Sequence, residues 1–215
     1  MRTLWLLPLL ALGCANITPI EDGKAHGPLV TIKDLFTSCY LLEAGDQVIL
    51  FDACWREGTL RRALEARGLA PEQVTHVLMT HGHADHTGGL ALLENAQLYA
   101  FEGEQANLSE HAGADGEIDR VLLDGETLVF GEQSVQVLAV PGHSPGSAVF
   151  VVGDVVILGD VGLFDSDGQL TTVPEDRSED PEEAARALAA LAERLRALGV
   201  RIEAVVPAHS GAGGL

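Results

Sequence analysis

The stretch THGHADHTGG, residues 80–89, constrains this chain more than any other part of its sequence. Within six positions it offers four side chains that can bind a metal ion: His81, His83, Asp85 and His86. The small residues Gly82 and Ala84 separate them, so the loop can pack tightly. An extended backbone would send the first three side chains to one side and the fourth elsewhere. The stretch therefore predicts part of a metal site whose remaining ligands lie further along the chain.

Three further candidate ligands each follow an apolar run of strand-like composition, as the first histidine of the stretch also does. His143 follows SVQVLAV, Asp160 follows VVIL, and His209 follows EAVVP. Strand ends at one edge of a sandwich can converge while the strands hold them rigid. We therefore expect these side chains to share one site with residues 81–86.

The pattern of apolar runs predicts many strands and a few covering helices, which favours sheets packed on each other with helices outside. The 215 residues suit one domain with a real core. The expected strands span residues 29–32, 37–43, 47–52, 74–80, 97–100, 119–123, 127–130, 134–140, 147–152, 155–158 and 203–206. The expected helices span residues 57–67, 88–94, 102–112 and 181–198.

The seven candidate ligands can be divided between two metal ions. One ion would take His81 and His83, and the other would take Asp85 and His86. His143 and His209 would complete the two sets, and Asp160 would bridge them. A set made only of imidazoles and carboxylates suits zinc, manganese or iron, and we expect two divalent ions, with Zn²⁺ favoured.

The motifs THGHADHTGG, PGHSPGS, GD and PAHSG occur in the order seen in the metallo-β-lactamase superfamily, which residues 29–211 resemble. The resemblance implies an α+β fold, a four-layer αββα sandwich formed by residues 28–215. It also implies a first metal bound by His81, His83 and His143. It implies a second bound by Asp85, His86 and His209, with Asp160 spanning both. One departure is Asp52-Ala53-Cys54, where the family usually has Asp-x-Gly.

Two divalent ions with a water between them generate hydroxide near neutral pH and polarise a carbonyl. The sequence therefore predicts a dinuclear metallohydrolase that attacks an ester-like bond, such as a thioester or lactone, in a small molecule. Asp85 would be the catalytic residue that orients the nucleophile and passes a proton to the leaving group.

Two other functional classes stay open: a mononuclear iron oxygenase of the persulfide dioxygenase type, and a metal-bearing binding protein without turnover. Within the hydrolases, the ligand set fits glyoxalase II-like thioesterases and lactonases. Asp160 argues against a true β-lactamase, and His83 argues against a flavodiiron protein. The tyrosine that lactonases carry after the bridging aspartate is absent, because this chain has Leu163 and Phe164 there.

Several other residues have two interpretations. Asp52 either orients a metal ligand or caps a turn. The aromatic residues of loops that flank the site in relatives could contact substrate, although a packing role is favoured: Phe36, Trp55 and Phe164. The remaining histidines are interpreted as ordinary surface or core residues: His26, His76 and His111.

The chain is strongly acidic, with 13 Lys and Arg against 32 Asp and Glu, so its formal net charge is −19. Nucleic acid binding depends on basic side chains, and no basic run occurs, so we expect no nucleic acid partner. The acidic segment 174–183, PEDRSEDPEE, is expected to be a solvated loop.

The N-terminal sequence MRTLWLLPLLALGCAN is typical of an export signal. Its apolar part is too short to cross a bilayer, and Gly13-Cys14 resembles a bacterial lipobox. We expect residues 1–13 to be a signal peptide, Cys14 to be the lipid-bearing mature N-terminus, and residues 15–27 to be a linker. The protein would then be exported and anchored at the periplasmic face of a membrane or at the cell surface.

Export would permit a disulfide between Cys39 and Cys54. These cysteines flank an expected hairpin that turns near Gly45-Asp46, and its register places Cys39 opposite Asp52. Cys54 would then be a diagonal neighbour about 7–8 Å away, which is long for a disulfide. We therefore expect two unbridged thiols.

Overall fold

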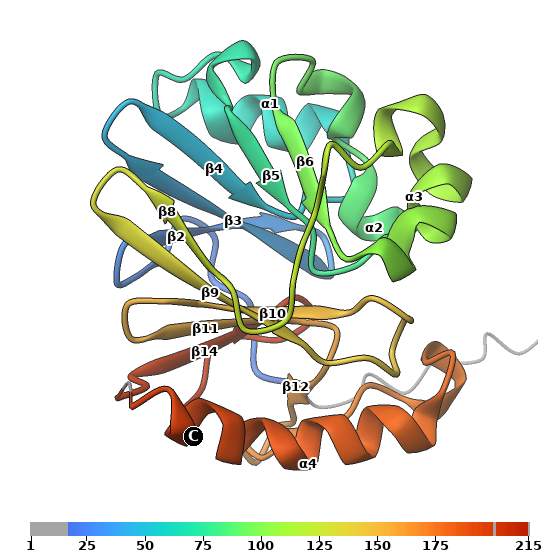
Figure 1. Cartoon of the computed structure of the whole chain (residues 1–215). Coiled ribbons are helices and arrows are strands. Elements are labelled where there is room, and N and C mark those ends of the chain that lie inside the picture. The colour runs from blue at the N-terminus through green and yellow to red at the C-terminus, as the bar shows by residue number, and fades with distance from the viewer. Residues whose placement is uncertain (1–16, 200, 215) are drawn as a thin grey trace, which may run out of the picture.

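The structure is a computed structural model that describes residues 17–199 and 201–214. The expected signal segment 1–13 and Cys14 lie outside the described residues. Two β-sheets face each other, and helices cover the outer side of each sheet (Figure 1). This confirms the expected α+β fold with αββα layers. No helix within the described residues is long and apolar enough to cross a membrane.

The first sheet changes from antiparallel to parallel along its width. Over the described residues its strands neighbour one another in chain order: β1 (Ala25–His26), β2 (Leu29–Asp34), β3 (Thr37–Ala44), β4 (Gln47–Phe51), β5 (His76–Leu78), β6 (Gln97–Ala100) and β7 (Arg120–Val121). Strands β1 to β4 pair antiparallel, and β4 to β7 pair parallel. Parallel neighbours need crossover connections. These contain α1 (Glu57–Glu65), α2 (Ala84–Thr87), α3 (Gln105–Ala112) and the 3₁₀ helices η1 (Pro71–Gln73), η2 (Leu90–Leu92), η3 (Glu102–Glu104) and η4 (Gly113–Gly116).

The second sheet has the order β14-β11-β10-β9-β8. Its strands are β8 (Thr127–Phe130), β9 (Gln133–Ala139), β10 (Ala148–Val152), β11 (Val155–Gly159) and β14 (Ala204–Pro207). Strands β11 and β14 are parallel, so the chain between them must cross over. That crossover contains the ribbon β12 (Leu163–Phe164) and β13 (Leu170–Thr171), the 3₁₀ helix η5 (Glu175–Arg177) and the long helix α4 (Pro181–Ala197).

Helix α4 has clear signals at both ends. The Asp180 side chain accepts a hydrogen bond from the Glu183 backbone N–H at 2.9 Å, and Pro181 occupies the first turn. Gly199, which follows the helix, has φ of +68°, a conformation that glycine adopts without strain. The expected helix 181–198 is therefore confirmed to within one residue.

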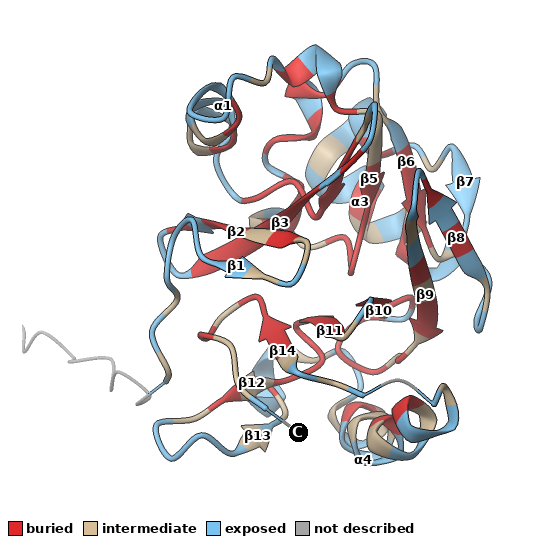
Figure 2. Ribbon diagram, turned by 90° about the vertical axis from the view of Figure 1, so that its left-hand side faces the viewer, coloured by how far each residue is buried: buried red, intermediate tan, exposed pale blue. Residues whose placement is uncertain are grey.

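The core has three apolar layers, as the stacking of helices and sheets requires. Between the sheets, the rings of Phe51 and Phe150 lie 5.3 Å apart and both are fully buried. Further clusters fill the spaces under α1 and α3 and under α4. Strands β10 and β11 are buried along their whole length, which explains their unbroken apolar sequences (Figure 2).

The structure differs from the sequence-based expectations in short segments. The expected helix 88–94 is only the 3₁₀ helix η2. The segment 17–27, within the expected linker, contains β1, and Thr18 accepts a backbone hydrogen bond from Gly211 at 2.6 Å. Residues 174–180 of the acidic segment form an exposed loop that includes η5, whereas residues 181–183 already belong to α4.

Candidate metal centre

The first group of candidate ligands follows β5, a strand in the parallel part of the first sheet. The extended backbone ends at His83, which has φ of −71° and ψ of 157° and precedes α2. The expectation that Asp85 continues an extended stretch is therefore wrong, because a helical turn begins at Ala84. On that turn Asp85 and His86 point about 100° apart, so each can reach a different partner.

The glycines at the end of this stretch allow its backbone to approach the turn that follows β4. The backbone N–H of Gly88 donates to the Cys54 carbonyl at 2.9 Å, and that of Gly89 donates to the Ala53 carbonyl at 3.0 Å. A Cβ on Gly88 would lie 1.8 Å from the Trp55 carbonyl oxygen. Any larger residue at position 88 would separate the ligand-bearing stretch from this turn.

His143 lies in the loop between β9 and β10, which the start of α4 holds in place. Gly142 has φ of +127°, and a Cβ there would lie 2.2 Å from the Ala184 backbone nitrogen. The carbonyl of His143 accepts a hydrogen bond from Glu179 N–H at 3.0 Å, and that of Gly142 accepts one from Asp180 N–H at 2.8 Å.

Asp160 and His209 follow the neighbouring parallel strands β11 and β14, so both emerge at the same edge of the second sheet. His209 Nδ1 lies 2.9 Å from the Phe36 carbonyl oxygen, which can only accept, so Nδ1 carries the proton. The other ring nitrogen, Nε2, points to Asp160 Oδ2 at 3.0 Å and to Asp85 Oδ2 at 3.3 Å.

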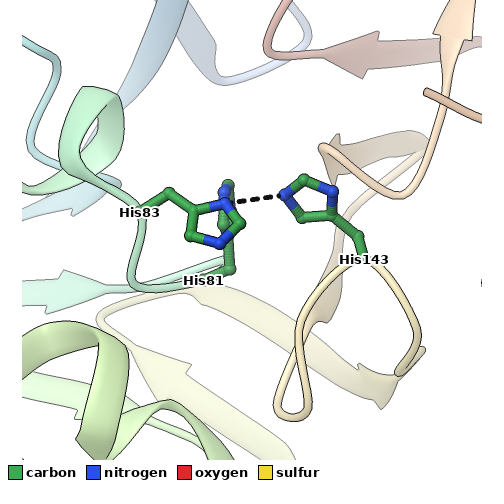
Figure 3. A group of neighbouring side chains, drawn as sticks. All are labelled: His81, His83 and His143. Atoms are coloured by element: carbon green, nitrogen blue, oxygen red, sulfur yellow. Dashed lines mark hydrogen bonds between the residues drawn. The ribbon is translucent and has the colours of Figure 1, made fainter. Parts of the chain in front are cut away.

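The structure brings all seven candidate ligands together. They form three overlapping groups, within each of which the possible ligand atoms all lie within 4.8 Å of one another: His81, His83 and His143; His81, His86 and Asp160; Asp85, His86 and His209. In the first group, His83 Nδ1 and His143 Nε2 are 3.0 Å apart, with His81 beside them (Figure 3). The spatial grouping matches the two sets expected from the sequence, with the carboxylate of residue 160 between them.

The donor atoms fit a metal ion because several of them have no other use. Among the described residues, six buried side-chain nitrogen or oxygen atoms have no hydrogen-bond partner. Three of these atoms face the other candidate ligands: His81 Nε2, His86 Nε2 and Asp160 Oδ1. A buried polar atom without a partner is unfavourable by about 1–3 kcal/mol. Cations coordinated by the cluster would satisfy its facing nitrogens and carboxylate oxygens.

Two histidines of the three-histidine group are held neutral. Burial lowers the pKa of His81 well below its ordinary value, and neighbouring histidines lower it further. Burial also lowers the pKa of His143 to about 4. A neutral imidazole is the form that coordinates a metal, so these two rings need not lose a proton when a metal ion binds.

The other group behaves differently because carboxylates surround it. Burial opposes the charged form of His86, but Asp160 and Asp52 outweigh it, and the pKa of His86 lies well above its ordinary value. Burial likewise opposes the charged form of His209, but Asp160 and Asp85 raise its pKa to about 10. Without a metal, this group therefore balances its carboxylates with protons.

A cleft of about 860 Å³ opens over the cluster. Its lining includes Phe36, whose ring stacks on His209 at 5.7 Å and packs against Trp55 at 4.8 Å. Half of the Phe36 surface is exposed, so it can contact a substrate. Phe164 is fully buried, which confirms the packing interpretation for that residue. The exposed His111 also lines the cleft, which its sequence context did not indicate.

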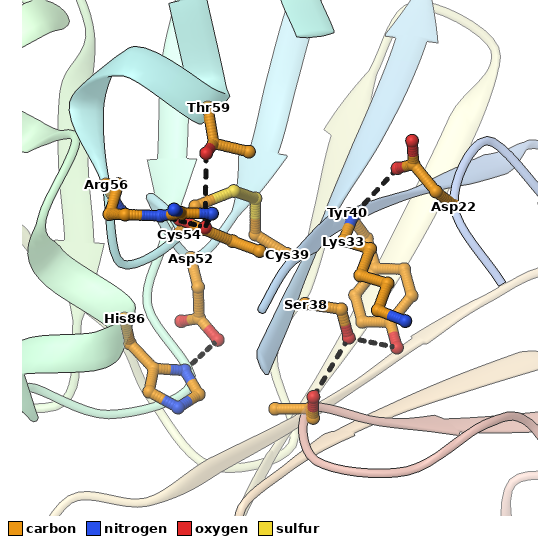
Figure 4. The surroundings of a disulfide bond; sticks show 12 residues. Asp22, Lys33, Ser38, Cys39, Tyr40, Asp52, Cys54, Arg56, Thr59 and His86 are labelled. Atoms are coloured by element: carbon orange, nitrogen blue, oxygen red, sulfur yellow. Dashed lines mark hydrogen bonds and ion pairs between the residues drawn. A yellow bond between two sulfur atoms is a disulfide. The ribbon is translucent and has the colours of Figure 1, made fainter. Parts of the chain in front are cut away.

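Asp52 orients a candidate ligand, which settles its two interpretations. One carboxylate oxygen accepts from the Thr80 backbone N–H, and the other accepts from the Thr80 hydroxyl, each at 2.7 Å. The second oxygen also lies 2.8 Å from His86 Nδ1, which leaves His86 Nε2 directed at the cluster (Figure 4). Such a contact fixes both the tautomer and the orientation of the ring.

The expectation of two unbridged thiols is wrong, because Cys39 and Cys54 form a disulfide with their Cα atoms 5.2 Å apart (Figure 4). The expected register is correct, since Tyr40 pairs with Phe51. However, β4 ends at Phe51, and Asp52 and Cys54 have φ of +62° and +55°. The chain therefore bends back towards β3. The left-handed Cys54 also explains why glycine is usual at this position in the family.

One wall of the cleft comes from the acidic segment, whose sequence indicated only solvation. Arg177, Ser178 and Glu179 line the cleft, and they precede α4. Neither charge nor periodicity distinguishes such residues from an ordinary loop. The hydrogen bonds from the backbone N–H groups of Glu179 and Asp180, which join this segment to the His143 loop, are tertiary features without a local signal.

Comparisons with known proteins agree with this geometry. The family model described as metallo-beta-lactamase superfamily matches residues 32–209. Metallo-beta-lactamase domain-containing protein 1 of Mus musculus is 36% identical over 205 residues, which cover 90% of this chain and 66% of the mouse protein. Hydroxyacylglutathione hydrolase of Shewanella sp. (strain ANA-3) is 29% identical over 67% of this chain and 51% of that protein. The matches thus span between half and two thirds of these relatives' lengths.

The fold itself is shared with solved structures of low sequence identity. A metallo-beta-lactamase from Pontibacter korlensis superimposes with a TM-score of 0.74 at 18% identity, and the match covers 91% of this chain and 93% of that one. Such a match shows the fold alone. The family match over residues 32–209, which is most of the chain, establishes that this chain belongs to the metallo-β-lactamase superfamily.

Proposed function

We propose that this protein is a dinuclear metal-dependent hydrolase that cleaves an ester-like bond in a small molecule. The observation that carries this proposal is the convergence of seven imidazole and carboxylate side chains beneath one cleft. When bound, a pair of divalent cations such as Zn²⁺ supplies a nucleophilic hydroxide near neutral pH and polarises a carbonyl. Fe or Mn ions also suit these donors.

In this proposal each side-chain group holds one cation. His81, His83 and His143 would hold the first, and Asp85, His86 and His209 the second, with Asp160 in contact with both. Two neighbours support this assignment by fixing ring orientation: the Asp52 carboxylate faces His86 Nδ1, and the Phe36 carbonyl faces His209 Nδ1. Each contact turns the opposite ring nitrogen towards the cluster.

Asp85 is proposed as the catalytic residue. Its carboxylate is partly exposed and lines the cleft, unlike the fully buried His86 beside it. Asp85 Oδ2 lies 3.3 Å from His209 Nε2, so it stands at the boundary between the cluster and the substrate space. From there it can orient the nucleophile and carry a proton to the leaving group.

Thioesters and lactones are the proposed substrate class. The relative named hydroxyacylglutathione hydrolase supports a thioester, because an acyl group on glutathione is joined through sulfur. The volume of the cleft, about 860 Å³, is sufficient for a small molecule. The net charge of −19 disfavours a nucleic acid substrate, whose phosphates need basic contacts.

Metal analysis of protein purified without chelator, paired with a substrate panel, tests this proposal. We expect about two divalent ions per chain and hydrolysis of a thioester or lactone, with little activity on β-lactams and phosphodiesters. One iron ion per chain with oxygen uptake on a persulfide would indicate the mononuclear oxygenase instead. Two bound ions with no turnover on any substrate would contradict hydrolysis.

The variant Asp85→Asn tests the catalytic role. Amide nitrogen replaces one carboxylate oxygen, so the side chain can no longer take up a proton at neutral pH. We expect kcat to fall by about 10²–10⁴-fold, the usual contribution of a general acid–base group. The matched variant Asp176→Asn changes another acid of the cleft lining and should retain activity. Full activity of Asp85→Asn at full metal content would contradict this role.

We also propose that the protein is exported and carries a lipid on Cys14. The sequence of residues 1–14 supports this, and so does the Cys39–Cys54 disulfide, since disulfides persist in oxidising compartments. Mass spectrometry of the membrane fraction should find a lipidated Cys14, and Cys14→Ser should release the protein. An unprocessed chain in the cytoplasm would contradict export.

A further inference from the structure

Glu104, the last residue of η3, is a fully buried carboxylate in the first half of the molecule. Its Oε1 accepts hydrogen bonds from the Ser144 hydroxyl and the Gly146 backbone N–H, both at 2.6 Å. Its Oε2 accepts one from the Gly82 backbone N–H at 2.7 Å and one from the Asn107 side-chain amide at 3.4 Å. Within the described residues, no ion pair joins Glu104 to a basic group, so hydrogen-bond donors alone compensate its burial. Burying such a group is unfavourable unless its oxygens are satisfied.

Two of the donors to Glu104 are direct chain neighbours of the three histidines. Gly82 lies between His81 and His83, and Ser144 directly follows His143. One carboxylate therefore ties together the two loops that carry all three histidines. These loops belong to different sheets, because one follows β5 and the other follows β9.

The packing around Glu104 leaves these loops little freedom to shift. A Cβ on Gly82 would lie 2.8 Å from Asn107 Cβ in α3, and a Cβ on Gly146 would lie 2.9 Å from Glu104 Cγ. A Cβ on Gly103 would lie 2.9 Å from the Gly146 backbone nitrogen. Glycine is therefore required for close approach at each position, and the carboxylate fixes the loops at that approach.

A carboxylate is the side chain that these donors require. Its two oxygens face backbone N–H groups from opposite sides, those of Gly82 and Gly146. A glutamine has nearly the same shape but must turn its NH₂ group towards one of these donors. Two donors would then face each other without an acceptor, which is unfavourable by about 1–3 kcal/mol in a buried site.

We propose that Glu104 is a positioning residue that holds His81, His83 and His143 in the geometry that binds the first metal ion. This inference rests on the proposed metal centre and adds to it a residue outside the seven ligands. None of the hydrogen bonds of Glu104 reaches Asp85, His86 or His209. Loss of the Glu104 carboxylate should therefore lower the affinity for the first ion and leave the affinity for the second unchanged.

The test uses single-site backgrounds so that each ion is measured alone. In full-length His209→Ala protein the three-histidine group is complete, and in His143→Ala protein the other group is complete. Isothermal titration with Zn²⁺, and the absorption spectrum with Co²⁺, are compared with and without Glu104→Gln in each background. We expect Kd to rise about 10–100-fold in the His209→Ala background, the usual effect of removing such a support, and to stay unchanged in the His143→Ala background.

Two companion variants separate positioning from general stability. Asp34 is also fully buried; it accepts hydrogen bonds from the Arg56 backbone N–H and the Thr59 hydroxyl and forms an ion pair with the Arg56 guanidinium. Asp34→Asn therefore disturbs another fully satisfied carboxylate, away from the three histidines. It should lower the melting temperature without changing the affinity for the first ion. Ser144→Ala keeps the carboxylate and removes one donor, so it should weaken the first ion by a smaller factor and still fold.

The outcomes distinguish this inference from the proposed function. If Glu104→Gln and Ser144→Ala both bind the first ion as tightly as their parent, the positioning role is wrong and the dinuclear centre stands. Equal weakening of both ions, or weakening matched by Asp34→Asn, would make Glu104 a general structural residue and overturn the proposal. If the unmodified protein binds no Zn²⁺ or Co²⁺, both ideas fail.

Discussion

The two halves of the candidate metal centre differ in the protonation of their histidines. The first half consists of His81, His83 and His143, and the pKa values of two of these rings are lowered by burial. The second half, with Asp85, His86 and His209, contains a carboxylate and has raised histidine pKa values. The first half is therefore ready for a cation, whereas the second must exchange protons for one.

The residues that hold the side chains of the two halves in place also differ. Hydrogen bonds from loop backbone and a hydroxyl group to Glu104 hold the first half, and packing of glycines leaves the loops little space. In the second half, Asp52 orients His86 and the Phe36 carbonyl orients His209 directly. The two ions should therefore differ in affinity, in pH dependence and in the substitutions that remove them.

The largest expected effect comes from removing one ligand of each half. His143→Ala should lose the first ion and His209→Ala the second, and each should lower kcat by at least about 10²–10³-fold, since transition-state charge loses a stabilising partner. Metal content per chain and thioester turnover measure both effects. His76→Ala, at a half-buried histidine packed on Tyr99, is the matched control and should keep both ions. Loss of both ions in both ligand variants would show that the halves are not separable.

Acidification should remove the second ion before the first. Because the pKa values of His86 and His209 are raised, a cation must displace their protons, and its affinity falls by about tenfold per pH unit for each proton displaced. His81 and His143 have lowered pKa values, so the first ion displaces no proton from them near neutral pH. Titrations in buffers of different ionisation enthalpy count the protons released. Equal release for both ions would contradict the difference between the halves.

Asp52→Asn should weaken binding of the second ion by about 10–100-fold, because the amide has only one accepting oxygen. Its NH₂ group must face either the Thr80 backbone N–H or the Thr80 hydroxyl and His86 Nδ1. The effect on the first ion should be smaller, since Asp52 reaches that half only through Thr80. Zinc titration of the variant in the His143→Ala and His209→Ala backgrounds measures each ion. A larger loss of affinity for the first ion than for the second would contradict the role of Asp52 in the second half.

The sequence predicted the convergence of the seven candidate ligands, because these residues are marked locally. Donor residues beside glycine or proline at strand ends need no tertiary information to be recognised, and His143, Asp160 and His209 lie where the patterns indicated. The sequence predicted the fold class but not the order of the strands within each sheet. Glu104 could not be found, because in sequence it is one of two acids at the start of an expected helix. Its role depends on burial, and on donors that come from 22 to 42 residues away.

The disulfide was not predicted, for a related reason. An ideal hairpin places Cys54 too far from Cys39, and only the left-handed conformations of Asp52 and Cys54 close that distance. Such φ values are unusual for residues other than glycine, so sequence alone gave no signal for them. The same bend turns Asp52 towards Thr80 and His86, so the disulfide and the support of the second half belong to one structural feature.

The smallest expected effect on metal binding therefore comes from the disulfide. Replacing Cys39 and Cys54 with alanine opens a link with a sequence separation of 15 residues, which should lower the free energy of unfolding by about 3 kcal/mol. The second ion should weaken a few-fold, because Asp52 keeps its hydrogen bonds but loses a neighbouring restraint, and the first ion should not change. Denaturant unfolding and zinc titration measure the two effects.

A matched variant isolates the disulfide from the backbone conformation beside it. Cys39→Ala with Cys54→Gly also lacks the bond, but glycine adopts the φ of +55° without the roughly 1–2 kcal/mol that other residues need. If both double variants weaken the second ion equally, the covalent link is what restrains Asp52. If the glycine variant binds the second ion as tightly as the unmodified protein, the left-handed turn alone presents Asp52, and the disulfide contributes only to stability. Weakening of the first ion in either variant would contradict the independence of the two halves.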